Sequence, residues 1–593
     1  MSNETAKAGH GPKSKAGKVF TNLLVTLVVG AIYFYISLPA FNLHSGDFYG
    51  FVFVLCVVYI LSSLVTSGFN LKGTAGLKEY LHFIKSQCLP IGILLAALII
   101  VAVVGEVVSM PLFRASAYRD LLDVPSGDFA TDITEISFDE IPRLDKDSVK
   151  ILGDRQMGTL SDMVSQFEVS GTYTQINYQG QPVRVAPLEY ADLIKWFTNR
   201  SSGLPAYVIV NMVTQEATVV RLPDGQGIKY SPSEPLNRNI MRHLRFQFPT
   251  YMFAAPVFEV DENGNPWWIA PKIVKTIGLF GGTDIQGAVL VNAITGECKY
   301  YEEVPTWVDN VYTPGLIAEQ YNYHGTLVHG FINSLFGQRD VTVTTDGSNY
   351  IALHDDVYMY TGITSVNADQ SNLGFLLSNQ RTKETKFYAA PGATEKSAQL
   401  SAMGVVQDLG YVATFPILLN ISGEPTYFIA LKDASDLVKQ YAMVNVKQYQ
   451  VVAIGATVVA TEQEYIRLLG DQGITVPEAL PQTTATGVIA ELRSAVLEGN
   501  TYYFLRLNDE EVFYSISAAD NNVAVILNVG DTVTIEHAPA GNTASSILSG
   551  YSVTLDQKAD GTAVPSSAPV IDLPIESQAP AAEETPLPTA TTE

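Results

Sequence analysis

The sequence predicts an α+β protein. We expect an N-terminal bundle of three transmembrane helices, extracytoplasmic repeated α+β modules of a helix plus an antiparallel hairpin, and a C-terminal small β-barrel. Three patterns carry this prediction: long apolar runs near the N-terminus, a turn motif that occurs three times, and short strand patterns that precede a tail rich in Pro and Ala. A chain of 593 residues has room for several domains of roughly 100–200 residues each.

Three apolar runs, Val19–Ala40, Phe48–Phe69 and Leu89–Leu112, predict membrane-spanning helices. Each run is close to or longer than the ~20 residues that cross a ~30 Å hydrocarbon core. Buried core helices are usually shorter and are interrupted by charges. A cleaved signal peptide fits poorly, because the first run is long and two more follow it. The membrane lipid bilayer is therefore the first partner that the sequence predicts.

The positions of the lysines predict the orientation of these helices. The loop at 41–49 has no lysine or arginine and carries Asp47. Positive residues favour the cytoplasmic side, which places the N-terminus inside and the chain after about Arg114 outside. We therefore expect a multi-pass cell-membrane protein with an extracytoplasmic C-terminal region. The lysines that set this orientation are Lys7, Lys13, Lys15, Lys18, Lys72, Lys78 and Lys85.

Charge and cysteine content describe the outer region. Residues 1–113 hold seven lysines against four acidic residues, a net charge of +3; the whole chain is −24, so the remainder is −27. Such acidity argues against DNA or RNA as a partner. Of the three cysteines, Cys56 and Cys88 lie in or beside apolar runs, and only Cys298 lies outside. The outer region must fold without an internal disulfide, a pattern typical of bacteria.

Glu106 is the only charged residue within the three apolar runs. A carboxylate inside a membrane is costly and is often functional, so a proton or ion role is one interpretation. The other interpretation, which we favour, is that the span is slightly shorter and Glu106 lies at the interface.

A turn motif, Asn-x-x-Thr-x-Glu, recurs at intervals of about 80–90 residues, the size of a small α+β module. Apolar or aromatic residues flank each copy. This pattern predicts a β-hairpin in which the Asn side chain caps the turn. The turn residues of the three copies are Asn211, Thr214 and Glu216; Asn292, Thr295 and Glu297; and Asn379, Thr382 and Glu384.

A second hairpin type has Gly-x-Pro in its turn and aromatic residues on the returning strand. It occurs at Gly264 and again at Gly423. Trp267 and Trp268 follow the first of these turns and are candidate partner-binding residues, although core packing is the more frequent reason for paired tryptophans. Between the hairpins, apolar residues at helical spacing predict helices. These stretches are 188–197, 236–248, 316–336 and 398–409.

The combination of a helix with a strand that ends in V-x-V-N-x-x-T-G-E resembles the PepSY-type domain of bacterial envelope proteins and peptidase propeptides. The stretch 291–297 is the closest match, and the other two copies lack its glycine. The chain also resembles poorly characterised membrane-anchored proteins of Gram-positive bacteria. The resemblance implies a non-catalytic module that binds or restrains partners, including proteases, outside the membrane.

Four strand patterns at 487–492, 501–507, 511–516 and 531–536 predict a small barrel of the OB-like or SH3-like kind. The chain after 555 has a composition that cannot bury enough apolar surface to fold. The expected domains are a cytoplasmic N-terminus at 1–18, three transmembrane helices at 19–113, an acidic stalk at 114–158, a first module at 159–225, a second at 226–310, a third, longer module at 311–480, the barrel at 483–555 and a disordered tail at 556–593.

No catalytic or cofactor motif appears in the sequence. His324 and His329 are five positions apart, which is not the spacing of a helical zinc pair. His354 is followed by Asp355 and Asp356, but this stretch reads as a hairpin turn. The glycine-rich stretch 278–287 leads into a strand and not into a helix, so it predicts close backbone packing or a flexible binding loop, not a phosphate loop.

These observations favour a membrane-anchored extracytoplasmic binding or scaffold protein of the bacterial cell envelope, which restrains or recruits an envelope protein or a protease. We expect no enzyme activity, no cofactor and no metal. Two alternatives stay open: a membrane-tethered envelope hydrolase, and an accessory subunit of a membrane transporter.

Overall fold

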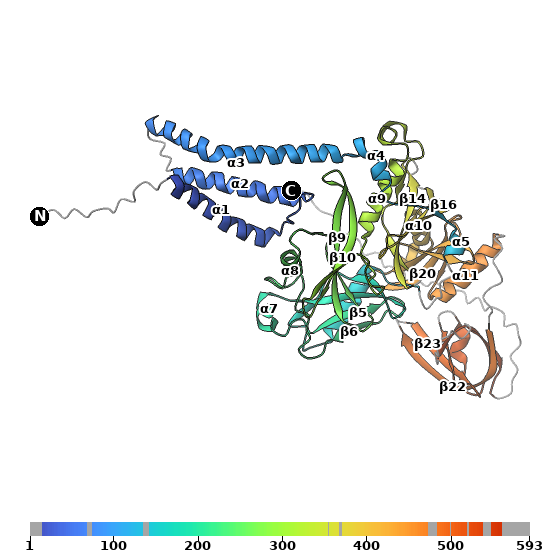
Figure 1. Ribbon diagram of the computed structural model, residues 1–593. Helices are drawn as coiled ribbons and strands as arrows, with labels where there is room; N and C mark the ends of the chain where they lie inside the picture. The colour runs from blue at the N-terminus through green and yellow to red at the C-terminus, as the bar shows by residue number, and fades with distance from the viewer. Residues whose placement is uncertain are drawn as a thin grey trace, which may run out of the picture. The chain divides into compact units, whose positions relative to one another are not determined.

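The computed structural model describes residues 15–67, 74–133, 141–353, 355–366, 371–472, 483–497, 500–518, 521–537 and 547–559. The chain divides into two compact units, Met1–Pro477 and Glu478–Glu593. Figure 1 shows the helices and strands of both units along the chain.

Three helices, α1 (Lys15–Ser37), α2 (Gly46–Ser67) and α3 (Thr74–Ser109), are long and apolar enough to cross a membrane. They confirm the prediction of three long apolar helices near the N-terminus, and their length and composition support a membrane location. The fully buried Asn22 lies between α1 and α2, and its Oδ1 accepts hydrogen bonds from the hydroxyls of Ser62 (2.9 Å) and Thr66 (2.8 Å). Such polar contacts hold helices together inside a bilayer, where burial of apolar surface alone gives little preference for association.

The rest of the first unit contains four sheets that share one strand order. In each sheet the first strand pairs with the third, the third with the fourth and the fourth with the fifth, while the second strand also pairs with the third. A helix precedes the strands each time. The chain after the three apolar helices is therefore mostly β with several sheets, as predicted.

The elements of the first and second sheets are as follows. The first sheet has α6 (Lys146–Gly158), β2 (Phe167–Val169), β3 (Thr174–Tyr178), β4 (Gln181–Tyr190), α7 (Leu193–Asn199), β5 (Ala206–Asn211) and β6 (Ala217–Arg221). The second has α8 (Ile240–Gln247), β7 (Met252–Phe253), β8 (Val257–Val260), β9 (Pro266–Ile277), β10 (Gly281–Asn292) and β11 (Cys298–Tyr301).

The range 311–480, expected to be one longer module, contains both remaining sheets. The third has α9 (Pro314–Thr326), the π-helix Asn333–Gly337, β12 (Thr342–Thr344), β13 (Asn349–Leu353), β14 (Asp356–Ser365), β15 (Ser371–Asn379) and β16 (Thr385–Ala393). The fourth has α10 (Glu395–Val405), the 3-10 turn Gln407–Leu409, β17 (Val412–Ala413), β18 (Ile417–Ile421), β19 (Glu424–Lys432), β20 (Val438–Asn445) and β21 (Val452–Gly455), and α11 (Val458–Asp471) follows.

The register of the four sheets is the same where the fourth strand ends. That strand ends in asparagine in every sheet. The residue after this Asn donates its backbone N–H to a carbonyl of the third strand, and the acceptor is the residue just before the one that pairs with the Asn. The bonded pairs are Met212 with Pro182, Ala293 with Pro266, Gln380 with Val357, and Val446 with Pro425. Sequence inspection found three of these copies and missed the one that ends at Asn445.

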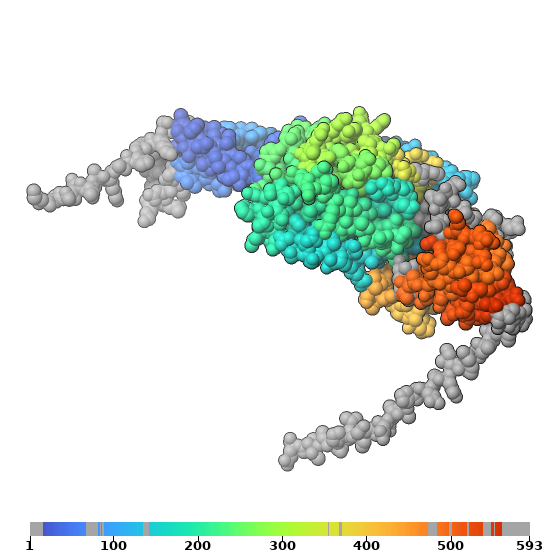
Figure 2. All heavy atoms as spheres, turned by 90° about the horizontal axis from the view of Figure 1, so that it is seen from below, coloured from blue at the N-terminus to red at the C-terminus, as the bar shows by residue number. Residues whose placement is uncertain are grey.

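The sheets bury their apolar faces in pairs. One core cluster combines residues of the first and second sheets, such as Val208 and Val289, which are fully buried. Another combines the third and fourth sheets, such as Phe375 and Leu418, also fully buried. Figure 2 shows the first two sheets, coloured teal to green, as one continuous surface. Core burial stabilises this region in the absence of disulfides, since the three cysteines are free.

The segment expected to be an acidic stalk is built into the fold. It contains α4 (Pro111–Arg119), β1 (Ser126–Gly127), α5 (Phe129–Asp132) and α6. β1 pairs in parallel with β16 of the third sheet. The carboxylates of Asp128 and Asp145 accept the backbone N–H groups of the first turns of α5 and α6, so part of the acidity serves helix capping.

The second unit holds β22 (Thr483–Leu497), β23 (Asn500–Leu507), β24 (Phe513–Ser517), a 3-10 turn (Asn522–Ile526), β25 (Thr532–His537) and β26 (Ile547–Gln557). The strands pair in the closed order β22-β23-β24-β26-β25. A separate core cluster, which includes the fully buried Leu505 and Val533, fills this unit. Its OB-like or SH3-like class stays a prediction. The tail at 560–593 lies outside the described residues.

Candidate functional site

The tip of the β9–β10 hairpin packs against the last turn of α3 (Figure 1). A Cβ atom added at Gly105 would lie 2.6 Å from a methyl carbon of Leu279 and 2.9 Å from the ring of Phe280. Gly278 has a φ of +63° and lies directly against Ser109. The glycines of the 278–287 stretch therefore permit close backbone packing, one of the two functions predicted for them.

Ser109 holds the tip through a complete set of hydrogen bonds. Its Oγ accepts from the backbone N–H groups of Leu279 (2.9 Å) and Phe280 (3.0 Å) and donates to the carbonyl of Gly105 (2.6 Å). His44, in the loop between α1 and α2, has its Nδ1 2.8 Å from the carbonyl oxygen of Leu279 and donates to it. Because Ser109 is buried, water cannot replace these bonds without opening the contact.

A second contact joins α8 to the end of α1. Arg245 Nε donates to the carbonyl of Leu38 at 2.9 Å, and Arg242 Nε donates to the carbonyl of Tyr35 at 3.2 Å. The Arg242 guanidinium also lies 4.2 Å from the centroid of the Tyr35 ring, a cation–π contact. Arg245 is buried, and this burial lowers its pKa. The arginines satisfy carbonyl groups at the helix end that would otherwise lack partners.

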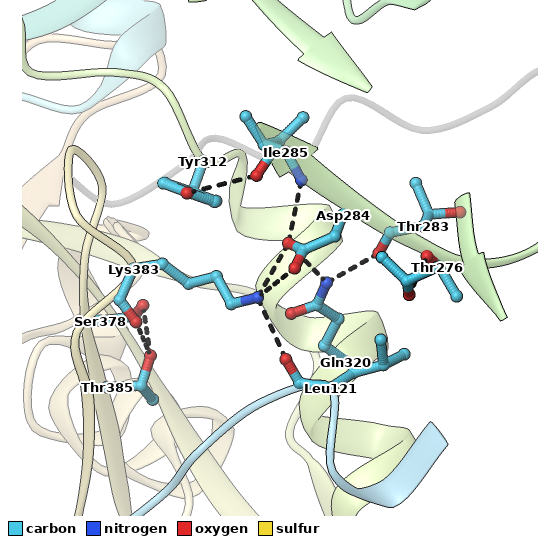
Figure 3. Close-up of polar contacts among 11 residues, drawn as sticks. Leu121, Thr276, Thr283, Asp284, Ile285, Tyr312, Gln320, Ser378, Lys383 and Thr385 are labelled. Atoms are coloured by element: carbon cyan, nitrogen blue, oxygen red, sulfur yellow. Dashed lines mark hydrogen bonds and ion pairs between the residues drawn. The ribbon is translucent and has the colours of Figure 1, made fainter. Parts of the chain in front are cut away.

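A half-buried ion pair fastens the second sheet to the third (Figure 3). Lys383 Nζ lies 2.8 and 2.9 Å from the two carboxylate oxygens of Asp284 and donates to the carbonyl of Leu121 at 3.1 Å. Gln320 of α9 donates to the carbonyl of Thr283 (2.7 Å) and to Asp284 (3.2 Å). Lys383 thus connects the second and third sheets to each other and to the segment around Leu121, which follows α4.

Two carboxyl groups are buried where the first three sheets meet. Glu259 of β8 is fully buried and accepts the backbone N–H groups of Asp309 (3.0 Å) and Asn310 (2.9 Å). Asp309 accepts the backbone N–H of Asn177 in β3 (2.7 Å). Burial raises the pKa of Glu259 to about 7, against these hydrogen bonds. Burial and the neighbouring Glu259 raise the pKa of Asp309 well above its usual value.

The three predicted Asn turns have the same geometry. Asn211, Asn292 and Asn379 each accept, at Oδ1, the backbone N–H groups of the residues two and three positions later. Each also accepts, at its own carbonyl, the N–H of the residue four positions later, which has positive φ. The Thr hydroxyls of the second and third copies, Thr295 and Thr382, accept the N–H of the Glu that follows. These residues shape the turns.

The two candidate tryptophans differ in their surroundings. Trp268 is only 3% exposed, belongs to the core and donates its indole N–H to the carbonyl of Tyr230 at 2.8 Å. It offers no surface to a partner. Trp267 is half-buried, donates to Asp261 of its own turn (3.1 Å) and packs against Trp307 with ring centroids 5.8 Å apart. Any partner contact at this position therefore rests on Trp267 and Trp307.

Glu106 lies one turn before Ser109 at the end of the third span, Cys88–Ser109. Its neighbour Gly105 faces the hairpin tip, whereas Glu106 is exposed on the helix surface. The structure therefore places it at the level of the docked hairpin, near the end of the span.

The histidines singled out in the sequence lie apart. His324 Nδ1 contacts the carbonyl of Arg119 at 3.2 Å, and His329 pairs with Asp340 at 2.8 Å. His354 lies outside the described residues, while Asp356 is held by Arg381 in a salt bridge at 2.6 Å. Within the described ranges, no group of three or more His, Cys, Asp or Glu side chains could hold a metal ion.

A cavity of about 350 Å³ opens beside the third sheet. Asp132 on its wall accepts from Lys386 Nζ and from the hydroxyl of Tyr388, both at 3.2 Å. Glu384, the acidic residue of the third Asn turn, also lines it. The cavity thus offers charges of both signs and aromatic rings, which suits a peptide side chain.

Comparisons with known proteins add little to this geometry. No protein-family model matches the chain, and no curated protein matches it. Among solved structures, a variant of B. megaterium levansucrase matches at 9% identity over 73% of this chain and 97% of the other, with a TM-score of 0.16. A likeness at that score supports no statement about fold or activity.

Proposed function

We propose that the chain is a membrane-anchored extracytoplasmic scaffold of the bacterial cell envelope, which binds an envelope protein or a protease through its array of sheets. The observation that carries the proposal is the docking of the β9–β10 tip onto α3. A flexible tether needs no such contact, whereas a scaffold that presents a surface at a set distance from the membrane does. The acidic composition and the lysine positions support an extracytoplasmic location.

The binding surface that fits this role lies on the third sheet and on the Trp267–Trp307 pair. The cavity beside Asp132 is concave and mixed in charge, and the tryptophan pair is half-buried with part of each ring exposed. Aromatic residues at such positions commonly anchor protein partners. The sequence carries no recognised catalytic motif, so we place the scaffold function ahead of the hydrolase alternative.

In-cell photo-crosslinking tests this proposal. A photoreactive residue at Trp307, or at Tyr358 on the wall of the Asp132 cavity, should capture a discrete protein from intact cells. One at Leu400, on the exposed side of α10, should not. Capture should persist when the membrane helices are replaced by an unrelated anchor. If neither position captures a protein above the Leu400 background, the scaffold proposal fails.

A second candidate function is that of an accessory subunit of a membrane transporter. The low burial of α3 within this chain favours it. Only 6% of its span is buried within the described structure, compared with 22% for α2. A partner helix could cover this face. In that case a polytopic membrane protein should co-purify with the helices alone, and the helix-swapped form should lose it.

A further inference from the structure

A group of large apolar side chains is exposed on and around α7. Leu193, Ile194 and Phe197 are 70%, 73% and 61% exposed, and they lie on one face of α7. Leu236 and Phe246, in the following segment and in α8, are also exposed. Soluble surfaces rarely gather apolar groups of this size without a partner. We call these five residues the α7 patch.

The α7 patch is continuous with the end of a membrane helix. Trp196 of α7 donates its indole N–H to Glu234 at 2.7 Å, and Arg238 donates to the carbonyl of Arg200 at 2.6 Å. The same segment reaches α1, because the hydroxyl of Tyr35 donates to Asn237 at 2.9 Å. The ring of Phe246 packs edge-on against Phe34 of α1 with centroids 5.7 Å apart. The patch is therefore level with the sheet-side end of α1, where the membrane surface lies.

The charge of this region is opposite to that of the chain. Residues 193–250 contain seven Lys or Arg and three Asp or Glu, a net charge of +4, in a chain whose total is −24. One of the three acidic residues, Glu234, is buried and accepts from Trp196 and from the hydroxyl of Tyr190 (3.0 Å). A local positive charge beside exposed apolar groups is the composition of an interfacial membrane contact.

A cavity of about 370 Å³ lies between α7 and the segment that precedes α8. Arg200 and Arg238 line it, together with Trp196, Ser201, Leu236, Asn237 and Glu234. The Glu234 carboxylate already accepts from Trp196 and Tyr190, so the two arginines leave the cavity with a net positive charge. The Arg200 guanidinium is stacked 4.6 Å from the ring centroid of Phe197, which orients it without neutralising it. Arginine side chains bind phosphate oxygens with two parallel hydrogen bonds.

We propose that the α7 patch inserts into the membrane leaflet on the sheet side and that its cavity binds the head group of an anionic phospholipid. The apolar side chains of Leu193, Ile194 and Phe197 enter the boundary between head groups and acyl chains. Arg200 and Arg238 hold the lipid phosphate. The first sheet thereby gains a lipid contact of its own, in addition to the three helices.

Site-directed spin labelling of the full-length chain tests the insertion. A nitroxide is placed at Ile194→Cys in a variant whose three native cysteines are alanine, and the protein is reconstituted in nanodiscs of phosphatidylglycerol and phosphatidylcholine. The label should collide readily with oxygen and poorly with a water-soluble nickel chelate. The matched control, Leu400→Cys, replaces an equally apolar exposed residue on α10 and should collide readily with the nickel chelate.

Each alternative gives a different result. Free access of the nickel chelate to position 194, as at position 400, would overturn the proposal. Poor access of both oxygen and nickel would show a protein contact in place of lipid and would also overturn it. Neither result bears on whether Trp307 or Tyr358 captures a partner in cells.

Native mass spectrometry of the detergent-extracted protein tests the head-group site. Phosphatidylglycerol should be retained over phosphatidylcholine, and Arg200→Gln and Arg238→Gln should each reduce that preference about fivefold, as expected for one basic residue at an anionic surface. Arg221→Gln, which alters an exposed arginine paired with Asp162, should leave the preference unchanged. An equal loss in all three variants, or in none, would contradict the assignment.

Discussion

The connection between the third and fourth strands differs between the second and fourth sheets, although the sheets share one strand order. In the second sheet this connection is the glycine-rich tip that docks on Ser109 of α3. In the fourth it is a short turn after Lys432, whose Nζ pairs at 2.6 Å with Asp145, the N-cap residue of α6. The carbonyl of Asp436 in this turn accepts from the Ser148 hydroxyl (3.2 Å). One connection reaches the membrane helices, and the other reaches the first sheet.

This difference shows where the repeated fold carries its individual functions. The strands keep a common register, so their residues are limited by pairing and burial. The connection is free to change, and in the first sheet it has become α7, with its exposed apolar face. Loops on a constant scaffold commonly acquire binding functions in this way.

The largest expected effect comes from filling the contact between the tip and α3. Gly105→Leu would place a side chain where the hairpin tip lies and should destabilise the detergent-solubilised protein by about 3 kcal/mol, the upper part of the usual range for overpacking. Gly92→Leu is the matched control, because nothing lies within 4 Å of its Cβ position on the same helix. Thermal unfolding followed by tryptophan fluorescence compares them. Equal effects would show that the tip does not hold α3.

A second difference between the sheets concerns a buried charge. Glu259 of β8 is opposite Trp267, and the position with the same register in the fourth sheet is the fully buried Leu419, opposite Thr426. The folded chain keeps the proton of Glu259 up to about pH 7, whereas the ordinary pKa is 4.5. The stabilisation that this proton gives is complete below pH 4.5 and is lost as the pH rises through 7.

We therefore expect the first unit to be less stable near pH 8 than near pH 5, by roughly 2–3 kcal/mol, and the raised pKa of Asp309 acts in the same direction. Glu259→Gln should flatten the dependence over that range. The midpoint of thermal unfolding, measured at several pH values for both proteins, gives the comparison. An unchanged slope in Glu259→Gln would remove Glu259 as its source.

Ion pairs offer a smaller contrast, between the pair that joins the second and third sheets and a pair within the fourth. Lys383→Met removes the half-buried partner of Asp284 and should cost about 1.5 kcal/mol, since a partly buried carboxylate loses its charged donor. Lys447→Met removes a more exposed lysine, 49% exposed against 16% for Lys383, from its pair with Glu424 in the fourth sheet and should cost less than about 1 kcal/mol. Urea titration of the two variants measures the difference in their free energies of unfolding. A reversed order would contradict the stabilising role assigned to the Lys383–Asp284 ion pair.

The turns should show a smaller effect than Lys383→Met. Asn211→Ala and Asn292→Ala each remove an acceptor for two backbone N–H groups and should each cost about 1 kcal/mol, as for a lost helix cap. Equal costs in the first and second sheets would match their common geometry. A neutral Asn292→Ala would show that the Gly296 turn closes without its cap.

The sequence predicted the membrane helices because length and composition decide them directly. It also predicted a strand-rich outer region, since turns and apolar strands alternate there. The fourth Asn turn was missed because its loop is one residue longer: Asn445 donates its N–H to Val451, whereas Asn292 donates to Glu297. The helix expected at 188–197 begins only at Leu193, because Leu188 and Tyr190 continue the buried pattern of β4.

The docking site could not be predicted from the sequence. Ser109 and Leu279 are 170 positions apart, and neither belongs to a catalytic or metal-binding motif. The glycines around position 280 gave a signal, which predicted close packing without naming what would pack. The α7 patch was hidden for a related reason: Leu193, Ile194 and Phe197 have the spacing of a core helix, and only the structure shows that their side chains are exposed.

A disulfide test addresses the central claim, the docking of the hairpin tip on α3, most directly. In a chain whose native cysteines are alanine, Gly105→Cys and Leu279→Cys would bring two Cβ atoms close together, because the Leu279 Cβ lies 3.0 Å from the Cβ position of Gly105. Mild oxidation in native membranes should join them, as detected by the linked peptide in mass spectrometry. The pair Gly92→Cys and Leu279→Cys should stay unlinked. If the first pair links no faster than the second, the docking of the sheet array on the membrane helices is contradicted.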